Sequence, residues 1–275
     1  PSLSLRGLTP QCGAMIVFER YVPWMMYAKD RDIVEFYFTV PNKPGQLKKA
    51  LEILAKYGIN ILSINAYSLP DWERAPVFIF ADYTGIDIDF KSIKSELRLV
   101  TGSEVHIRKP STRGFMMDEL AFPLYVFPGV RSLIMLERDF QEMIKGLYEK
   151  LSETAAVFLY HLAYSGGKFL AEYLSKKLNL RGKDLLVETL KVYQAGGWGR
   201  VKLVRYNPYS MEIVLRLYNS IECKIFRGSG RPASQFIRGH ISGLLTKILG
   251  KDVRAVETKC IAKGDLYCEF SVEPV

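Results

Sequence analysis

The first third of the chain alternates apolar runs with a segment of helical periodicity. Residues 33–40 are mostly β-branched and aromatic, which predicts a buried strand. Within 46–57, apolar residues recur at the spacing of one helix face, and Gly58 follows as a stop signal. That face consists of Leu47, Ala50, Leu51 and Leu54. The pattern therefore predicts a strand followed by an amphipathic helix.

The same alternation continues to about residue 109. Two strand-like runs, 60–69 and 76–83, flank the polar loop P-D-W-E-R-A. Asp89 is a suitable N-cap for a second helix, with Phe90, Ile93 and Leu97 on its apolar face. A final strand at 103–109 completes the order βαββαβ. This order predicts a ferredoxin-like sandwich, in which two helices cover one sheet of four antiparallel strands.

Beyond residue 115 the pattern changes. Helical periodicity dominates from 137 to about 194, with breaks expected at Ser165-Gly166-Gly167 and at 179–182. Strands are expected at 121–127, 131–136, 200–206 and 211–218, a helix at 233–249, and a terminal hairpin formed by 253–260 and 267–272. This order predicts an α+β domain in which an antiparallel sheet lies beside a helical layer.

A plausible linker, K-P-S-T-R-G at 109–114, divides these patterns. We therefore expect an N-terminal extension (1–30), a first domain (31–110) and a second domain (111–275), in keeping with a length of 275 residues and a mean hydropathy of +0.02. No apolar run reaches the roughly 18 residues that span a bilayer. Charged residues and a proline interrupt the stretch 14–28, which argues against a signal peptide. The expected location is cytoplasmic.

The net charge of +9 lies mainly in residues 111–275, with 24 basic and 17 acidic groups. Such an excess suggests nucleic-acid binding. The basic residues are, however, spread through amphipathic segments such as 168–183, and no helix-turn-helix or zinc-finger spacing is present. Solvated helix faces are the simpler interpretation, and a DNA-associated regulator is kept as an alternative.

The motifs P-N-K-P-G-Q-L (41–47) and G-I-N-I (58–61) occur within the predicted sandwich. Together with the element order, they resemble the ACT domain family of small-molecule-binding regulatory modules over about residues 31–110. In that family the loop between the first strand and helix often holds an amino acid at an interface between two domains. The resemblance implies a homodimer and a ligand site at Asn42, Gly45, Gln46, Asn60 and Ile61.

The residue types in this loop suit such a site. Gly45 lets a ligand approach the backbone, and free N–H groups at a helix start attract a carboxylate. Asn42 stands where many family members have Asp, so effector recognition is expected to differ or to be absent. The alternative is that Pro44-Gly45 only builds a tight entry to the helix.

Two of the four cysteines, Cys260 and Cys268, flank the predicted terminal turn, and Glu257 lies just upstream. Thiolates and a carboxylate ligate zinc, which favours four tetrahedral ligands. Glu257 and Cys260 would face opposite sides of a regular strand, so both reach one ion only if the strand twists or bulges. A Cys260–Cys268 disulfide, unusual in a reducing cytoplasm, or free buried thiols would also produce this pattern.

This region resembles the 4-vinyl reductase domain family, which senses small hydrocarbons and is related to subunits of a vesicle-tethering complex. The matching residues are Asn219–Glu222, Gly239, Gly243, Gly250, Glu257, Cys260, Gly264 and Cys268. Metal-binding members use a Cys, a Glu and two further Cys as zinc ligands. Three of these positions are filled here, but the first falls at Ser234, a poor zinc ligand. Cys223 or His240 is a candidate replacement, and a remnant site without an ion is the alternative.

The resemblance also implies that Trp198, in G-G-W-G, borders a ligand pocket. The sequence shows no G-x-S-x-G, Walker or H-E-x-x-H motif, and none of His106, His161 and His240 lies in the context of a general base. We expect a regulatory protein rather than an enzyme, with an amino acid or related metabolite bound by the first domain and an apolar small molecule by the second. An enzyme acting on a vinyl or hydrocarbon substrate and a scaffold that has lost its ligands are further alternatives.

Overall fold

The computed structural model describes residues 19–275, which divide into two compact units, one up to Ser132 and one from Leu133 onward. Residues 1–18, the larger part of the expected extension 1–30, lie outside the described residues. The division falls later than the expected linker at 109–114. The reason is that residues 115–117, expected to open the second domain, pair with a strand near the start of the first unit.

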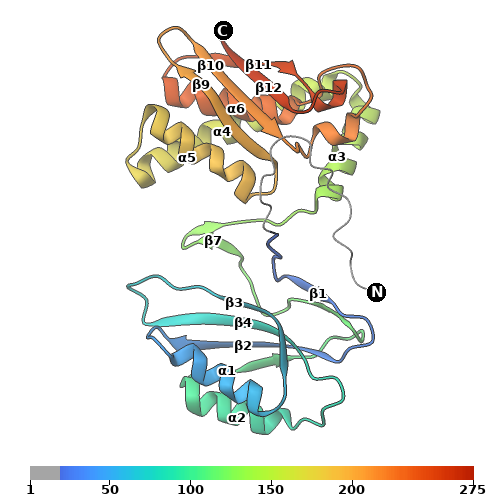
Figure 1. Cartoon of the computed structure of the whole chain (residues 1–275), viewed down its shortest axis with the longest axis vertical. Coiled ribbons are helices and arrows are strands. Elements are labelled where there is room, and N and C mark those ends of the chain that lie inside the picture. Colours follow the sequence, from blue (N-terminus) through green and yellow to red (C-terminus); the bar gives the residue numbers. More distant parts are fainter. Residues whose placement is uncertain (1–18) are drawn as a thin grey trace. The chain divides into compact units, whose positions relative to one another are not determined.

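The first unit contains the predicted βαββαβ order, and the ferredoxin-like fold is confirmed (Figure 1). Four antiparallel strands form its sheet in the order β3-β4-β2-β5, and both helices lie on one face. The strands are β2 (Ile33–Pro41), β3 (Asn60–Ala66), β4 (Arg74–Asp82) and β5 (His106–Arg108), and the helices are α1 (Gln46–Lys56) and α2 (Phe90–Thr101). The last strand is shorter than the 103–109 expected.

Strand alternation and helix capping explain this arrangement. Phe36 and Phe38 on β2 are fully buried against the helical layer, because alternate side chains of a strand face the same side. The Asp89 carboxylate caps α2 as predicted, accepting a hydrogen bond from the Lys91 N–H (2.9 Å). Gly102 ends α2 in the left-handed conformation.

A two-stranded ribbon contacts the other face of this sheet. It consists of β1 (Met25–Tyr27) and β6 (Phe115–Met117), which pair antiparallel. Met116 is buried there against Ile33 and Phe80, whose side chains point away from the helices. Two short strands, β7 (Tyr125–Phe127) and β8 (Val130–Arg131), follow and replace the longer runs expected at 121–127 and 131–136.

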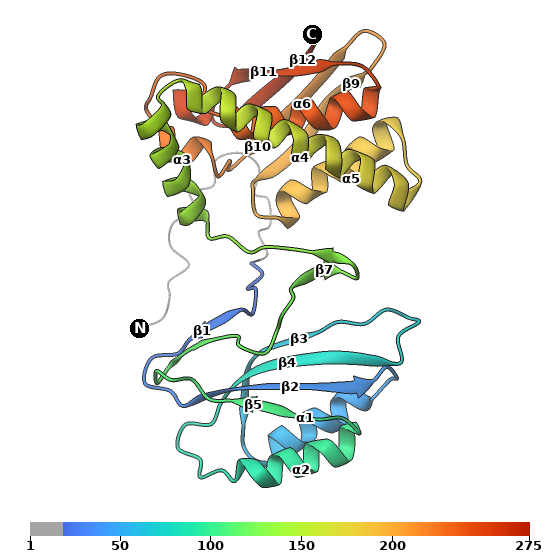
Figure 2. The same cartoon turned by 180° about the vertical axis from the view of Figure 1, so that it is seen from behind.

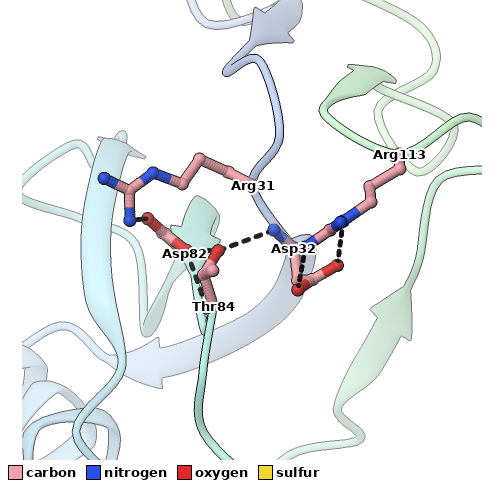
Figure 3. A network of polar contacts seen from close by, with 5 residues as sticks. All are labelled: Arg31, Asp32, Asp82, Thr84 and Arg113. Atoms are coloured by element: carbon pink, nitrogen blue, oxygen red, sulfur yellow. Dashed lines mark hydrogen bonds and ion pairs between the residues drawn. The ribbon is translucent and has the colours of Figure 1, made fainter.

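Polar contacts join the ribbon to the sheet (Figure 3). The Arg113 guanidinium, just before β6, donates to both carboxylate oxygens of Asp32 at 2.8 and 3.0 Å. The Asp32 N–H donates to the Thr84 hydroxyl (2.7 Å), and Arg31 forms an ion pair with Asp82 (3.5 Å). These contacts attach residues 109–117 to the first unit rather than leaving them as a linker.

The second unit is the predicted α+β domain (Figure 2). Its antiparallel sheet has the order β11-β12-β10-β9, α6 packs on the sheet, and α4 packs on α6. The helices are α3 (Glu137–Leu151), α4 (Thr154–Leu178), α5 (Gly182–Ala195) and α6 (Gln235–Leu249), with 3₁₀ turns η1 (Cys223–Phe226) and η2 (Ile261–Lys263). The strands are β9 (Arg200–Asn207), β10 (Glu212–Tyr218), β11 (Val253–Lys259) and β12 (Cys268–Pro274).

The predicted helix break at Ser165-Gly166-Gly167 is wrong, because α4 runs through it without interruption. A Cβ atom at Gly167 would overlap the carbonyl oxygen of His240 on α6. Gly239 and Gly243 on α6 face the backbone of α4 in the same way. These glycines let two helix backbones approach closely, and this packing outweighs the low helix propensity of glycine.

The helices are instead interrupted between α3 and α4, where Ser152 has a positive φ of 49°. The break predicted at 179–182 is confirmed: α4 ends at Leu178, Asn179 has a φ of 53°, and α5 begins at Gly182. Among residues 19–275, no helix combines the length and apolar character of a membrane span.

Candidate functional site

Four side chains of the second unit converge on one point. Cys223 lies on η1, Glu257 near the end of β11, Cys260 at the cap of η2 and Cys268 at the start of β12. One ligand-type atom from each lies within 4.8 Å of all the others. The structure thus brings together Glu257, Cys260 and Cys268, as predicted, and adds Cys223 as the fourth member.

An irregularity in β11 makes this convergence possible. The pairing of β11 with β12 shifts register between Glu257, opposite Phe270, and Lys259, opposite Glu269. A bulge of this kind re-aims the residues that follow it. Glu257 and Cys260 consequently reach the same point, which a regular strand would not allow.

The spacing of the thiols fits a tetrahedral ion. The Cys223 sulfur lies 3.5 Å from that of Cys260 and 3.4 Å from that of Cys268. Two sulfurs at about 2.3 Å from a tetrahedral zinc are about 3.8 Å apart, so the cluster needs only small adjustments. Because Cys223 is almost equally close to the other two thiols, the geometry suits a shared ion better than a single Cys260–Cys268 bridge.

Backbone groups support the thiols of the hairpin. The Ala262 N–H donates to the Cys260 sulfur (3.4 Å), and the Ile261 N–H donates to the Cys268 sulfur (3.5 Å). Such N–H donors stabilise thiolates, which are the metal-binding form of cysteine. The donor set of three thiols and one carboxylate therefore fits zinc.

Ser234, the position expected to hold the first ligand, supports Glu257 instead. Its hydroxyl donates to one carboxylate oxygen of Glu257 (2.6 Å), and its N–H donates to the other (3.1 Å). The hydroxyl also lies 2.7 Å from the Cys223 sulfur. Ser234 thus orients the carboxylate, and the neighbouring Cys223 supplies the fourth ligand-type atom of the cluster.

The protonation equilibria of this cluster are strongly perturbed. Burial raises the pKa of Glu257 to about 8. Contacts with Cys260 and Cys268 raise the pKa of the Cys223 thiol, and the same contact with Cys223 lowers the pKa of Cys260. Several buried acidic groups close together favour either shared protons or a cation that compensates their charge.

Glu222 is a structural residue whose role the sequence pattern did not reveal. It is fully buried, and its carboxylate accepts hydrogen bonds from the N–H groups of Phe236 (2.8 Å) and Ile237 (3.0 Å) in the first turn of α6. Burial raises its pKa to about 8. The motif N-S-I-E was the available signal, but only the tertiary structure shows that its Glu caps a helix further along the chain.

A second group, the aromatic cluster, comprises Tyr193, Trp198, Phe236 and His240. The Trp198 ring makes edge contacts with Tyr193 (5.6 Å between centroids), Phe236 (5.5 Å) and His240 (5.1 Å). The Tyr193 hydroxyl is hydrogen-bonded to His240 Nδ1 (2.7 Å), and burial lowers the pKa of His240 to about 4. His240 is therefore a neutral imidazole in this cluster and is not a member of the cysteine–glutamate group.

The residues predicted as a ligand site in the first unit fall into two groups. Asn42, Gly45 and Gln46 lie at the start of α1, where Gly45 has a φ of 82° and open space around it. Asn60 and Ile61 begin β3 beside Asp82 and Ala81. Asn60 lies beside the end of β4 that pairs with Ile33, at the start of β2. Asn42 follows Pro41, at the other end of β2, so the two groups lie at opposite ends of the sheet.

The Asn42 amide is already engaged by the protein. Its nitrogen donates to the carbonyl oxygens of Leu69 and Trp72, both at 2.9 Å. These bonds tie the start of α1 to the loop between β3 and β4. Asn42 therefore shapes the loop, and its amide donors are not available to a ligand.

Comparisons with known proteins identify a domain in each unit. A model of the ACT domain matches residues 34–97, and a model of the 4-vinyl reductase domain matches residues 213–274. Two uncharacterized proteins of Methanocaldococcus jannaschii are similar over part of the chain. MJ1642 is 30% identical over 107 residues, 39% of this chain and 62% of that protein. MJ0150 is 45% identical over 108 residues, 39% of this chain and 58% of that protein. The chain spans less than two thirds of either relative.

Two solved structures resemble about half of the chain. The phenol-responsive sensory domain of the transcription activator PoxR, with phenol, is 18% identical and has a TM-score of 0.47, covering 52% of this chain and 77% of that chain. A vinyl-4-reductase family protein from Methanocaldococcus jannaschii is 21% identical and has a TM-score of 0.39, covering 52% and 84%.

Proposed function

We propose that this chain, which contains an ACT domain followed by a 4-vinyl reductase domain, is a regulatory protein that senses two small molecules. The presence of both domains fits a ligand-sensing role. In this proposal the ACT domain binds an amino acid or a related metabolite, and the second unit binds an apolar small molecule. The protein acts as a homodimer.

The aromatic cluster is the observation that carries the proposal for the second unit. Its polar groups are few: the Tyr193 hydroxyl and His240 are hydrogen-bonded to each other, and the Trp198 ring adds one indole N–H. Because the imidazole is neutral, the cluster holds no charge that would require a counter-ion. Such surroundings favour an uncharged apolar or aromatic ligand. Trp198 and Phe236 are half-buried, whereas Tyr193 and His240 are buried. A ligand would therefore reach the cluster beside the Trp198 ring.

The start of α1 supports the proposal for the first unit. The first-turn N–H groups of a helix attract a carboxylate, and no side chain blocks the approach at Gly45. Because the amide nitrogen of Asn42 is engaged, its oxygen is left to accept a hydrogen bond from a ligand amine. Asn60 and Ile61, at the other end of the sheet, would belong to a site only if a second copy supplied them.

The proposed zinc site has a structural role. Cys223, Glu257, Cys260 and Cys268 would hold the ion. When bound, zinc would supply a cross-link between η1 and the terminal hairpin. Ser234, the N-cap residue of α6, would hold the ligating carboxylate in place. The ion would thus keep the elements around the aromatic cluster in register, because Phe236 and His240 lie on the same helix.

A titration with toluene, followed by tryptophan fluorescence, tests ligand binding in the second unit. The wild-type protein is expected to show saturable quenching that is lost in Trp198→Phe, whose remaining tryptophans, Trp24 and Trp72, lie in the first unit. Native mass spectrometry of freshly purified protein is expected to show a dimer with one zinc per chain. Absence of saturable quenching, or equal quenching in the variant, would count against the proposed ligand site of the second unit.

A further inference from the structure

A crevice of about 550 Å³ opens in the second unit at a place that neither the aromatic cluster nor the metal ligands occupy. It lies between one side of α4, the first turns of α6 and the start of the edge strand β11. The lining residues are Ala156, Val157, Tyr160, His161, Tyr164, Arg238, Asp252, Val253, Arg254 and Val275. A crevice of this volume is large enough for a small organic ligand.

One wall of the crevice is aromatic, and the remaining lining combines aliphatic residues with His161, Arg238, Asp252 and Arg254. Tyr160 and Tyr164, one helical turn apart on α4, stack with their ring centroids 6.1 Å apart and their planes 26° apart. Of the valines in the lining, Val253 is buried and Val157 is exposed. These surfaces would cover the apolar body of a ligand.

The cation Arg238 lines the same crevice. Its guanidinium carbon lies 4.7 Å from the centre of the Tyr160 ring, and one terminal nitrogen donates to the Gln235 side-chain oxygen (2.7 Å). Within the described part of the chain, the buried Nε of Arg238 has no hydrogen-bond acceptor. Among the same residues, no carboxylate forms an ion pair with its guanidinium. A partly desolvated charge of this kind is stabilised when an anion binds.

The other charged side chains of the lining are differently placed. Arg254 is exposed and already forms an ion pair with Glu273 (3.2 Å). Asp252 is exposed at the rim. Arg238 is therefore the cation that a bound anion would neutralise, and its guanidinium lies over the Tyr160 ring.

We propose that this crevice binds an amphipathic monocarboxylate, with its carboxylate on Arg238 and its apolar body against Tyr160 and Tyr164. This inference goes beyond the proposed function, because the crevice is a different site from the aromatic cluster. Charge-assisted contacts with guanidinium groups distinguish a carboxylate from a neutral molecule of the same shape.

Isothermal titration of the full chain with 3-phenylpropionate and with 3-phenylpropan-1-ol tests the inference, because these probes differ in charge but little in size. The acid is expected to bind the wild-type protein at least about tenfold more tightly than the alcohol, the ratio typical of one charge-assisted contact. Arg238→Gln is expected to remove this preference, weakening the acid about tenfold and the alcohol less than about threefold. Arg205→Gln is the matched control, because Arg205 is an exposed arginine of the second unit that pairs with Glu212 (3.3 Å) and does not line the crevice. It is expected to leave binding of the acid within about threefold of wild type.

A cooperative thermal melt close to that of the wild-type protein verifies that the Arg238→Gln variant is folded. If it is not, Arg238→Lys serves in its place: it retains a charge but cannot stack and donate as a planar fork, and intermediate binding of the acid is expected. Equal binding of both probes by wild type, unchanged binding of the acid by a folded Arg238→Gln, or no binding of either probe would overturn the inference. The toluene titration at Trp198 is independent, so failure of the carboxylate site and failure of the proposed function are distinguishable.

Discussion

Glu35 allows a direct test of how much a buried carboxylate destabilises the first unit. It lies on β2, on the sheet face opposite the helices, in register with Phe80 on β4 and Arg108 on β5. Only 1% of its surface is exposed, and among the described residues neither carboxylate oxygen has a hydrogen bond of good geometry, although the Asp118 carboxylate and the Glu119 backbone lie nearby. An ionised carboxylate in this position would be costly. We predict that Glu35→Gln stabilises the protein at neutral pH.

The magnitude follows from the pKa. Burial, reinforced by the nearby Asp118 carboxylate, raises the pKa of Glu35 from its ordinary 4.5 to about 8. Between these values the folded protein keeps a proton that the unfolded chain has lost, so stability falls as the pH rises from 4.5 to 8. The slope is about 1.4 kcal/mol per pH unit. Glutamine has no proton to lose, and its advantage over glutamate is expected to grow from near zero at pH 4.5 to ~3 kcal/mol at pH 7.

Urea unfolding at pH 5, 6, 7 and 8 measures this difference. In a Trp198→Phe background, fluorescence reports on Trp24 and Trp72, both in the unit that contains Glu35. Glu52→Gln is the control, since Glu52 is an exposed glutamate on α1 and its removal is expected to change stability little at any pH. An advantage of Glu35→Gln that does not increase with pH would refute the reasoning.

Three further predictions concern single contacts. Cys223→Ser is expected to reduce bound zinc, measured by elemental analysis, because it removes one of the four candidate ligands; zinc equal to that of the wild-type protein would exclude Cys223 as a ligand. Gly243→Ala is expected to lower the free energy of unfolding by about 2 kcal/mol or more, because the new Cβ would meet the α4 backbone. Gly146→Ala, in open space on α3, is expected to raise it by about 0.5–1 kcal/mol. The melting temperatures of the two variants should therefore move in opposite directions. Asp89→Ala is expected to lower the free energy of unfolding, measured in urea, by about 1 kcal/mol. An unchanged free energy would mean that the cap does not stabilise α2.

Local patterns were sufficient for most elements of the first unit and for several of the second. The apolar face of α1, the cap at Asp89 and the alternation of β2 each arise from interactions between residues close in the chain. The terminal hairpin and the helix after residue 233 could be predicted for the same reason. The nearby positions of Glu257, Cys260 and Cys268 also identified three members of the cysteine–glutamate cluster.

Tertiary contacts decided the remainder. Glycine has a low helix propensity, so Gly167 alone predicts a helix break. Only the close packing of α6 explains why α4 continues through Gly167. Cys223 joins the cluster from η1, and a bulge in β11 turns Glu257 and Cys260 toward it. In the sequence Glu35 is an ordinary polar residue of a strand, and only the packing of the β1–β6 ribbon near this face of the sheet shows that it is buried. A periodic pattern specifies which face of an element is apolar, but it does not specify what will cover that face, because the partner is chosen by packing across the whole chain.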